Sequence, residues 1–116
     1  MERELERLLY RAGVLRTYVG YNYFIKAVML VYENPVRLLH ACKEIYIPIA
    51  EEFNADPRSV EKDLRTVRDV FMRNNGKTVL KEMGFFIWHE RPYPRELIEI
   101  FAAYLRANYK QNEIDS

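Results

Sequence analysis

The stretch IAEEFNADPRSVEKDLRTV, from Ile49 to Val67, decides the fold because it has the form of two helices joined by a tight turn. Ala50 is a small residue in the first helix, so a second helix can cross close beside it. The letters NADP supply the turn, and Val60 stands where a helix-turn-helix buries a β-branched residue. The pattern predicts a helix-turn-helix whose second helix lies in the major groove of double-stranded DNA.

The second helix of this pair has clear sequence signals at both ends. Asp56 is a favourable N-cap, and Pro57 suits the first helical position, where its missing N–H costs nothing. The Asn74-Asn75-Gly76 sequence is expected to end the helix. Between these ends, one apolar stripe recurs at spacings of four, three and four residues and is expected to be buried: Val60, Leu64, Val67 and Phe71.

The outward face of this helix carries residue types that suit DNA. Arginine bonds guanine bidentately, glutamate accepts from cytosine, and lysine, arginine, serine and threonine hold phosphates. Residues 57–77 carry six basic and three acidic side chains, a charge of +3, whereas the whole chain has +1. The candidate DNA-binding residues are Arg58, Ser59, Glu61, Lys62, Arg65, Thr66, Arg68 and Lys77.

A second interpretation of the same pattern is a solvated charged face on an ordinary helix pair. Corners between helices that contain an alanine are common, and Asp63 and Asp69 would bring carboxylates close to phosphates. The net charge of +1 is also lower than is typical of a nucleic-acid module. The pattern alone therefore leaves both interpretations open.

The rest of the chain predicts a single all-α domain of about six helices, since 116 residues suit one domain and most segments have a helical period. We expect the domain to occupy 1–110 and 111–116 to be a disordered tail. The expected helices outside the helix-turn-helix are near 2–12, 18–32, 78–83 and from 94 onward, with a short one at 48–53 before the turn.

Two segments between these helices carry specific expectations. Asn34 is expected to cap a helix with Pro35 in its first turn, so that Val36, Leu39 and Cys42 face inward. The aromatic stretch Phe85–Tyr93 is expected to pack as a loop or an edge hairpin. Tyrosines at helical spacing more often form core and rim than an aromatic site, and here they are Tyr18, Tyr21, Tyr23 and Tyr32.

Composition excludes several other classes of protein. Apolar residues make up 49% and charged residues 30%, as in soluble globular domains, and without a signal peptide the chain is expected to be cytoplasmic. The apolar run at 24–31 contains Lys26 and is too short to span a membrane. His40 and Cys42 are two apart on a helix and point to different faces, so no metal site is expected. Without a glycine-rich phosphate loop or a marked acid/base pair, we expect neither an enzyme nor a cofactor.

The stretch GYNYFIKAVMLVY, Gly20 to Tyr32, resembles the element that opens the effector domain of the sporulation initiation response regulator family. LLHACKEIYIPIAEEFNADPRSVEKDLRTV resembles the helix-turn-helix of that domain, GKTVLKEMGFFIW the segment that follows, and ELIEIFAAYL its last helix. The resemblance covers about Leu8 to Lys110. The residues that carry it best are Gly20, Tyr21, Tyr23, Ala27, Val31, Tyr32, Ile49, Ala50, Val60, Glu61 and Arg65.

This resemblance implies a six-helix effector domain that binds short DNA boxes, often as tandem copies, with a homodimer on tandem sites as a possible assembly. The residues that fall where the family contacts bases and phosphates are Arg58, Ser59, Glu61, Lys62 and Arg65. Lys62 replaces an arginine and keeps its charge but not its bidentate fork. Thr66 replaces a histidine, Asp63 replaces a small apolar residue, and the arginine at 58 stands one position early. We therefore expect a different target sequence or a reduced affinity.

Two hypotheses about function follow. The first is a sequence-specific DNA-binding transcriptional regulator without catalysis. Regulators of this family carry a receiver domain ahead of the effector domain, and this chain starts at Met1 without one, so we expect a stand-alone relative or an excised domain. The second is a protein-interaction module that binds a full-length regulator or RNA polymerase, with Phe85–Tyr93 and the tyrosines near Tyr18 as its exposed patch.

Overall fold

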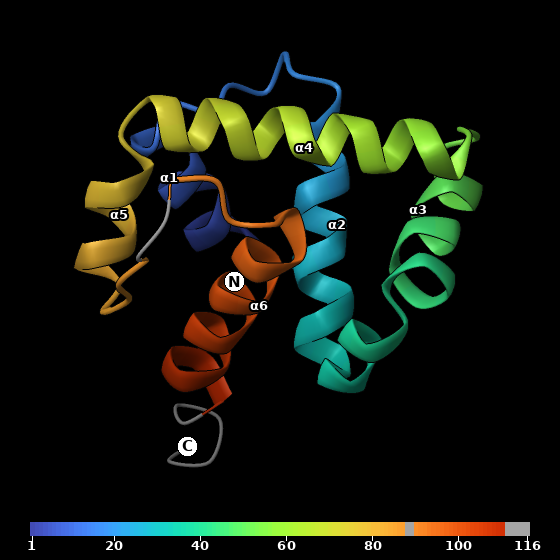
Figure 1. Cartoon of the computed structure of the whole chain (residues 1–116). Helices are drawn as coiled ribbons and strands as arrows, with labels where there is room; N and C mark the ends of the chain where they lie inside the picture. Colours follow the sequence, from blue (N-terminus) through green and yellow to red (C-terminus); the bar gives the residue numbers. More distant parts are fainter. Residues whose placement is uncertain (88–89, 111–116) are drawn as a thin grey trace.

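Helix α2 (Gly20–Glu33) runs through the middle of the protein, and the other helices pack around it (Figure 1). The computed structural model describes residues 1–87 and 90–110. Helix α2 has apolar residues on nearly every side, and such a helix is stable only when it is buried. It contacts α1, α3, α4 and α6, and seven of its apolar side chains are buried: Tyr21, Tyr23, Phe24, Ala27, Val28, Leu30 and Val31.

Five further α-helices complete the arrangement. They are α1 (Glu2–Arg11), α3 (Ile47–Glu52), α4 (Pro57–Arg73), α5 (Gly76–Glu82) and α6 (Pro94–Leu105). Three short turns of tighter or wider helix join or extend them: the 3₁₀ segment η1 (Pro35–His40) and the π-helical segments η2 (Cys42–Tyr46) and η3 (Arg106–Lys110). No strand occurs in the described ranges, so the prediction of an all-α fold with about six helices is confirmed.

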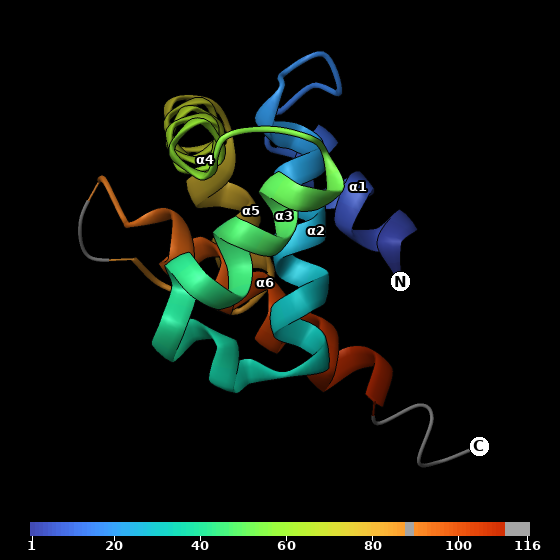
Figure 2. The same ribbon diagram turned by 90° about the vertical axis from the view of Figure 1, so that its right-hand side faces the viewer.

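The longest helix, α4, lies across the N-terminal end of α2, and Figure 2 shows it end-on. Its predicted apolar stripe is buried as expected: Val60, Leu64 and Phe71 are 0% exposed and Val67 is 1% exposed. The stripe meets α6 through Phe101, whose ring lies edge-on to Phe71 at 5.7 Å and to Phe24 at 5.4 Å. One aromatic cluster therefore joins α2, α4 and α6.

Three hydrogen bonds hold the C-terminal end of α4 against the C-terminal end of α1. Asn75 N–H donates to the carbonyl of Ala12 at 3.2 Å, and the Asn74 side-chain amide donates to the carbonyl of Gly13 at 3.1 Å. The Asn75 side chain also donates to Arg11 O at 3.2 Å. The asparagines that were expected to end α4 therefore also fix its direction relative to α1.

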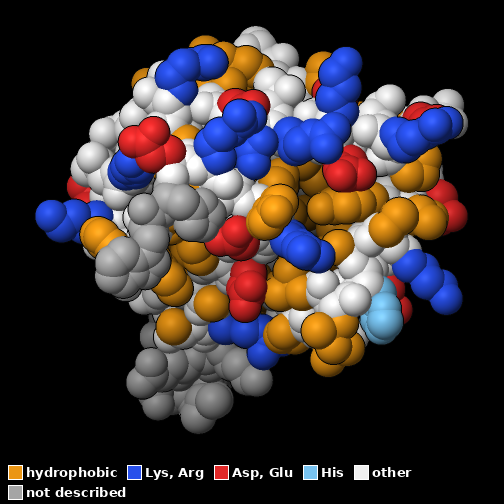
Figure 3. All heavy atoms as spheres, in the orientation of Figure 1, with side chains coloured by type: hydrophobic (Ala, Val, Ile, Leu, Met, Phe, Trp, Pro, Cys, Tyr) orange, Lys and Arg blue, Asp and Glu red, His pale blue; other side chains and the backbone are white. Residues whose placement is uncertain are grey.

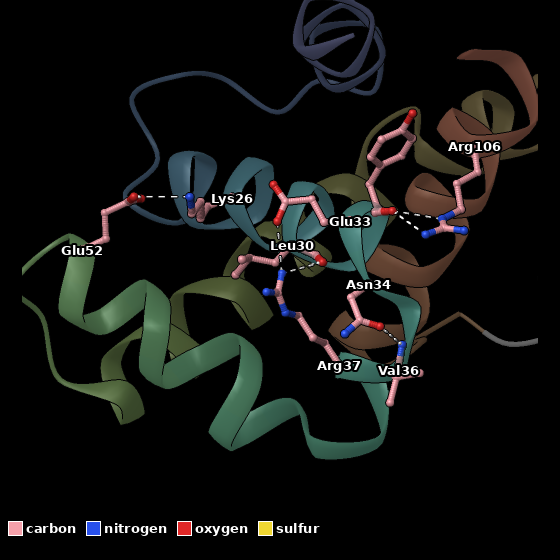
Figure 4. Close-up of polar contacts among 9 residues, drawn as sticks. Lys26, Leu30, Glu33, Asn34, Val36, Arg37, Glu52 and Arg106 are labelled. Carbon is pink, nitrogen blue, oxygen red and sulfur yellow. Dashed lines mark hydrogen bonds and ion pairs between the residues drawn. The ribbon is translucent and has the colours of Figure 1, made fainter. Parts of the chain in front are cut away.

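The C-terminal end of α2 is held by side chains from two other segments (Figure 4). Arg106 donates to the Tyr32 carbonyl from Nε at 3.0 Å and from Nη2 at 2.7 Å, and Arg37 Nη1 donates to the Leu30 carbonyl at 2.9 Å. Both carbonyls lie in the last turn of α2, where backbone acceptors begin to lack helical partners, and Leu30 O also accepts from Asn34 N–H at 3.1 Å. The Asn34 side chain accepts from Val36 N–H at 3.1 Å, which confirms the predicted cap.

The inward orientation expected for Val36, Leu39 and Cys42 is wrong. Val36 is 57% exposed, Leu39 is 76% exposed and Cys42 is exposed. Residues 35–40 form a 3₁₀ segment with three residues per turn instead of an α-helix, so the predicted helical positions do not hold here. Val36 and Leu39 therefore turn outward together, while Ala41 and Ile45 fill the core.

The remaining expectations concern 76–93 and the chain end. Helix α5 begins at Gly76, two residues before the predicted start, and Gly84 has φ 93°, as suits the glycine that closes it. No strand is present in the described part of 85–93, and Trp88 and His89 lie outside the described residues. The expected tail at 111–116 also lies outside them. Tyr21 and Tyr23 are buried and Tyr18 and Tyr32 are half-buried, so these tyrosines form core and rim as expected.

Asp56 gives a first test of the local structure that starts α4. Its Oδ1 accepts from Arg58 N–H at 2.7 Å, and Pro57 follows at the first helical position. Loss of such a cap costs about 1 kcal/mol. We expect Asp56→Ala to lower the free energy of unfolding by about that amount in chemical denaturation, and Asp56→Asn to change it much less. Equal losses for the two substitutions would contradict a capping role.

Candidate nucleic-acid interface

Helices α3 and α4 form the predicted helix pair. Ile49 and Val60 are 0% exposed and Ala50 is 3% exposed, so the small residue and the β-branched residue lie in the core as expected. The turn between the helices is tight because Ala55 N–H donates to Ala50 O at 2.8 Å and Asn54 takes φ 52°. Asparagine tolerates this left-handed conformation better than most residues. The geometry is that of a helix-turn-helix.

A glycine allows α4 to lie directly on α2. A Cβ atom at Gly20 would overlap the carbonyl oxygen of Asp63 and lie 2.8 Å from Val67 Cγ2. Only a residue without a side chain lets the two backbones approach this closely. One edge of α4, at Asp63, therefore faces α2. The sequence analysis named Gly20 only through the family resemblance and gave it no packing role.

The N-terminal half of α4 presents most of the candidate DNA-binding residues to solvent. The Arg58 side chain is 93% exposed, and Ser59, Lys62 and Thr66 are exposed. Arg65 and Glu61 are each about half exposed and form an ion pair of 3.5 Å between Nη1 and Oε1. Basic side chains gather along α4 in the space-filling view (Figure 3). The structure thus brings six of the eight candidates together as exposed residues on the N-terminal half of one helix.

Arg68 does not lie on this outward face, so its expected position is wrong. Its side chain is 8% exposed, Nε donates to Asp69 Oδ1 at 2.6 Å, and Nη1 donates to the Pro92 carbonyl at 2.7 Å. Arg68 follows Leu64 by four residues and precedes Phe71 by three, so it flanks the buried stripe. That spacing was a signal in the sequence that Arg68 packs inward. Its role is to tie α4 to the segment before α6.

The eighth candidate, Lys77, lies on α5, away from the N-terminal half of α4. Its side chain is 54% exposed, and Nζ lies 3.4 Å from Glu90 Oε1. Arg91 was missed by the sequence analysis, although its Nη2 lies 3.7 Å from Asp69 Oδ1 on α4. Residues distant in sequence thus add cations beside α4.

An open groove of about 810 Å³ runs along the edge of α4 opposite Asp63. It lies between η2, α4 and the start of α6, and the residues that line it are Ala41, Cys42, Tyr46, Glu61, Arg65, Arg68, Arg91, Tyr93, Pro94, Arg95 and Glu96. Burial raises the pKa of Tyr46, and the charge of Glu61 adds to this, so the phenol stays a neutral O–H group at physiological pH. Of the residues that line it, only Glu61, Arg65 and Arg68 were predicted from the sequence, as DNA contacts on one helix.

A match to a known family bears on the two interpretations of the helix pair. A family model described as sporulation initiation factor Spo0A C terminal matches residues 5–105. The chain belongs to this family. The Spo0A C-terminal family consists of DNA-binding effector domains, so at the family level the helix pair is that of a DNA-binding regulator. The match extends from α1 to the end of α6 and includes the whole helix-turn-helix.

Two further findings concern other kinds of site within 1–87 and 90–110. None of the helices there is long and apolar enough to cross a membrane. No group of three or more His, Cys, Asp or Glu side chains in those ranges is arranged to hold a metal ion.

Proposed function

We propose that this chain is a sequence-specific DNA-binding regulator of transcription, which acts on chromosomal DNA in the cytoplasm without catalysis. The observation that carries the proposal is the exposed N-terminal half of α4, held on a buried helix-turn-helix crossing. A helix held in this way can enter the major groove with its first turns against the base edges. Membership of the Spo0A C-terminal family supports DNA as the partner.

Each exposed side chain has a proposed role that follows from its chemistry and position. Base edges are approached by Arg58, Ser59, Glu61 and Lys62, whereas Arg65, Thr66 and Lys77 hold the backbone. The Arg58 side chain is 93% exposed, and its ion pair with Asp56 is a long one of 3.7 Å. Glu61 is paired with Arg65, so a base contact by either residue requires that pair to open or to be shared.

Selection of bound duplexes from a random DNA pool, with purified protein at moderate salt, tests the function itself. Enrichment of one short motif is the expected result and would give the target. If the folded protein enriches no motif, sequence-specific binding is wrong. If two copies of the motif at fixed spacing are enriched, binding by a homodimer on tandem sites is supported as well.

Arg58→Ala and Lys77→Ala test the assignment of roles. Loss of a base-contacting arginine costs about 1–3 kcal/mol and relaxes preference at one base pair, whereas loss of a phosphate contact weakens binding to all sequences alike. We expect the first pattern for Arg58→Ala and the second for Lys77→Ala, measured as dissociation constants over single-base variants of the selected duplex. Both side chains are exposed, so melting temperatures should not change. Equal losses on every duplex for both substitutions would contradict these roles.

A protein-interaction module is the second candidate, because several large apolar side chains are exposed. Phe86 is 73% exposed and Tyr93 is 66% exposed, in the stretch expected to form such a patch. Tyr21 and Tyr23 are buried and cannot be part of it. A full-length regulator or RNA polymerase would be the partner. Binding of purified RNA polymerase that is lost with Phe86→Ser, and that persists without DNA, would favour this candidate.

A further inference from the structure

The groove beside α4 has a fixed position relative to the recognition helix. Arg68 is buried beneath it and donates to the Pro92 carbonyl, so the segment before α6 cannot move independently of α4. Arg91 adds a second link, because its Nη2 lies 3.7 Å from Asp69 Oδ1. The side chains of residues 91–95 are therefore presented at a defined place along the helix.

The lining of the groove carries more arginines than carboxylates. Four arginines and two glutamates line it, a formal balance of +2. Glu61 is paired with Arg65, and Glu96 accepts from Tyr93 N–H at 3.1 Å at the start of α6. Asp69, next to the groove, is paired with Arg68 and Arg91. Each carboxylate is thus already engaged.

Arg95 is the arginine of the groove that takes part in none of these ion pairs. Its guanidinium stacks over the exposed Tyr93 ring at 5.9 Å, and within the described parts of the chain no carboxylate lies at ion-pair distance from it. Stacking on an aromatic ring orients a guanidinium while it leaves the N–H groups free to donate. Tyr46, whose phenol stays neutral, adds a hydroxyl to the same groove. Guanidinium and hydroxyl groups of this kind suit a phosphate diester.

The two edges of α4 differ in what they face, and this indicates which edge a DNA backbone strand could approach. Glu61, Arg65 and Arg68 recur at spacings of four and three and face the groove, whereas Asp63 faces α2. A helix in the major groove has one phosphate strand on each side. The groove edge of α4 consequently faces one of those two strands when the N-terminal half of the helix contacts the bases.

We propose that residues 91–95, with Arg65 across the groove, form a clamp for the DNA backbone strand that runs along this edge of α4, and that Arg95 contacts its phosphates. This proposal rests on the proposed function, because it requires a duplex bound through α4. It extends the DNA interface to a segment that lies beyond the helix-turn-helix. Hydrophobic side chains lie below the basic side chains on this face in Figure 3, so the phosphates would sit at the rim of the groove.

The test compares Arg95→Ala and the charge reversal Arg95→Glu with a matched control, Arg3→Ala. Arg3 is an exposed arginine on α1 that lines a separate hollow. Its removal therefore changes the net charge as much as Arg95→Ala does, but not at the groove. Dissociation constants are measured by fluorescence anisotropy between about 50 and 200 mM salt. The probes are the selected duplex and a mixed-sequence duplex, each about two helical turns long. Melting temperatures verify that each variant is folded.

Arg95→Ala is expected to weaken binding to both duplexes by roughly three- to ten-fold. It should also reduce the slope of log affinity against log salt by about one. Arg95→Glu is expected to have a larger effect in the same direction, and Arg3→Ala should leave both quantities unchanged.

Three outcomes would overturn the clamp. If the wild-type protein binds and both Arg95 variants keep its slope and affinity, the clamp is wrong while the proposed function stands, and an acidic protein segment becomes the better occupant of the groove. If Arg95→Ala alters preference at one base pair without a change of slope, the contact is to a base. If the wild-type protein binds neither duplex, the proposed function and the clamp fail together.

Discussion

Phe101→Ala is expected to lower the free energy of unfolding by about 3–5 kcal/mol, as large-to-small substitutions of buried phenylalanine do. The Phe101 ring is 0% exposed and lies edge-on to both Phe24 and Phe71. Its removal opens a cavity at the point where α2, α4 and α6 meet, and both edge-on contacts are lost. Chemical denaturation followed by circular dichroism measures the loss.

The matched control is Phe101→Leu, which keeps most of the apolar volume but not the ring. We expect it to cost clearly less than the alanine variant, because a smaller cavity remains and only the aromatic contacts are lost. If both substitutions cost less than about 1 kcal/mol, the aromatic cluster does not hold these helices together.

Gly20→Ala is expected to have the second largest effect, a loss of about 1–3 kcal/mol from overpacking. The new methyl group would overlap the Asp63 carbonyl oxygen and lie 2.8 Å from Val67 Cγ2. Backbone atoms of α4 cannot yield as a flexible side chain can, so α2 and α4 must move apart. Since the proposed DNA-contacting residues lie on the N-terminal half of α4, DNA binding should weaken as well.

The expected decrease in stability is opposite in sign to the change that helix propensity alone predicts. In a helix without such a contact, alanine is favoured over glycine by roughly 1 kcal/mol. The control Asn22→Ala changes an exposed residue on the same helix and is expected to be neutral or slightly stabilising. A Gly20→Ala protein that is more stable than the wild type would show that the two helices do not approach this closely.

The sequence predicted the helix-turn-helix and its surroundings well because local rules govern them. The stripe from Val60 to Phe71, the cap at Asp56 and the turn over NADP each depend on neighbours within a few residues. Val36 and Leu39 were placed wrongly for a different reason. Their spacing of three suits both an α-helix and a 3₁₀ segment and does not say which side faces the core, which Ala41 and Ile45 occupy instead.

The candidate site was only partly predictable. Residues on the N-terminal half of α4 could be found from one helical period, and the structure brings six of them together. The groove could not, because it is built from three segments that are distant in sequence: Ala41–Tyr46, Glu61–Arg68 and Arg91–Glu96. Arg68 joins two of these segments through its hydrogen bond to the Pro92 carbonyl. The sequence had instead predicted that its side chain contacts DNA.

The exposed side of α4 carries Arg58, Ser59, Lys62 and Thr66. The fold is stabilised by other parts of the helix: its buried side, its N-cap and the asparagines at its C-terminal end. Substitutions on an exposed helical face usually change stability by less than about 0.5 kcal/mol. If α4 contacts base edges as proposed, substitutions at these positions can change the preferred DNA sequence while the protein continues to fold. Such freedom would let duplicated copies of this domain acquire separate sets of target genes without first acquiring a new architecture.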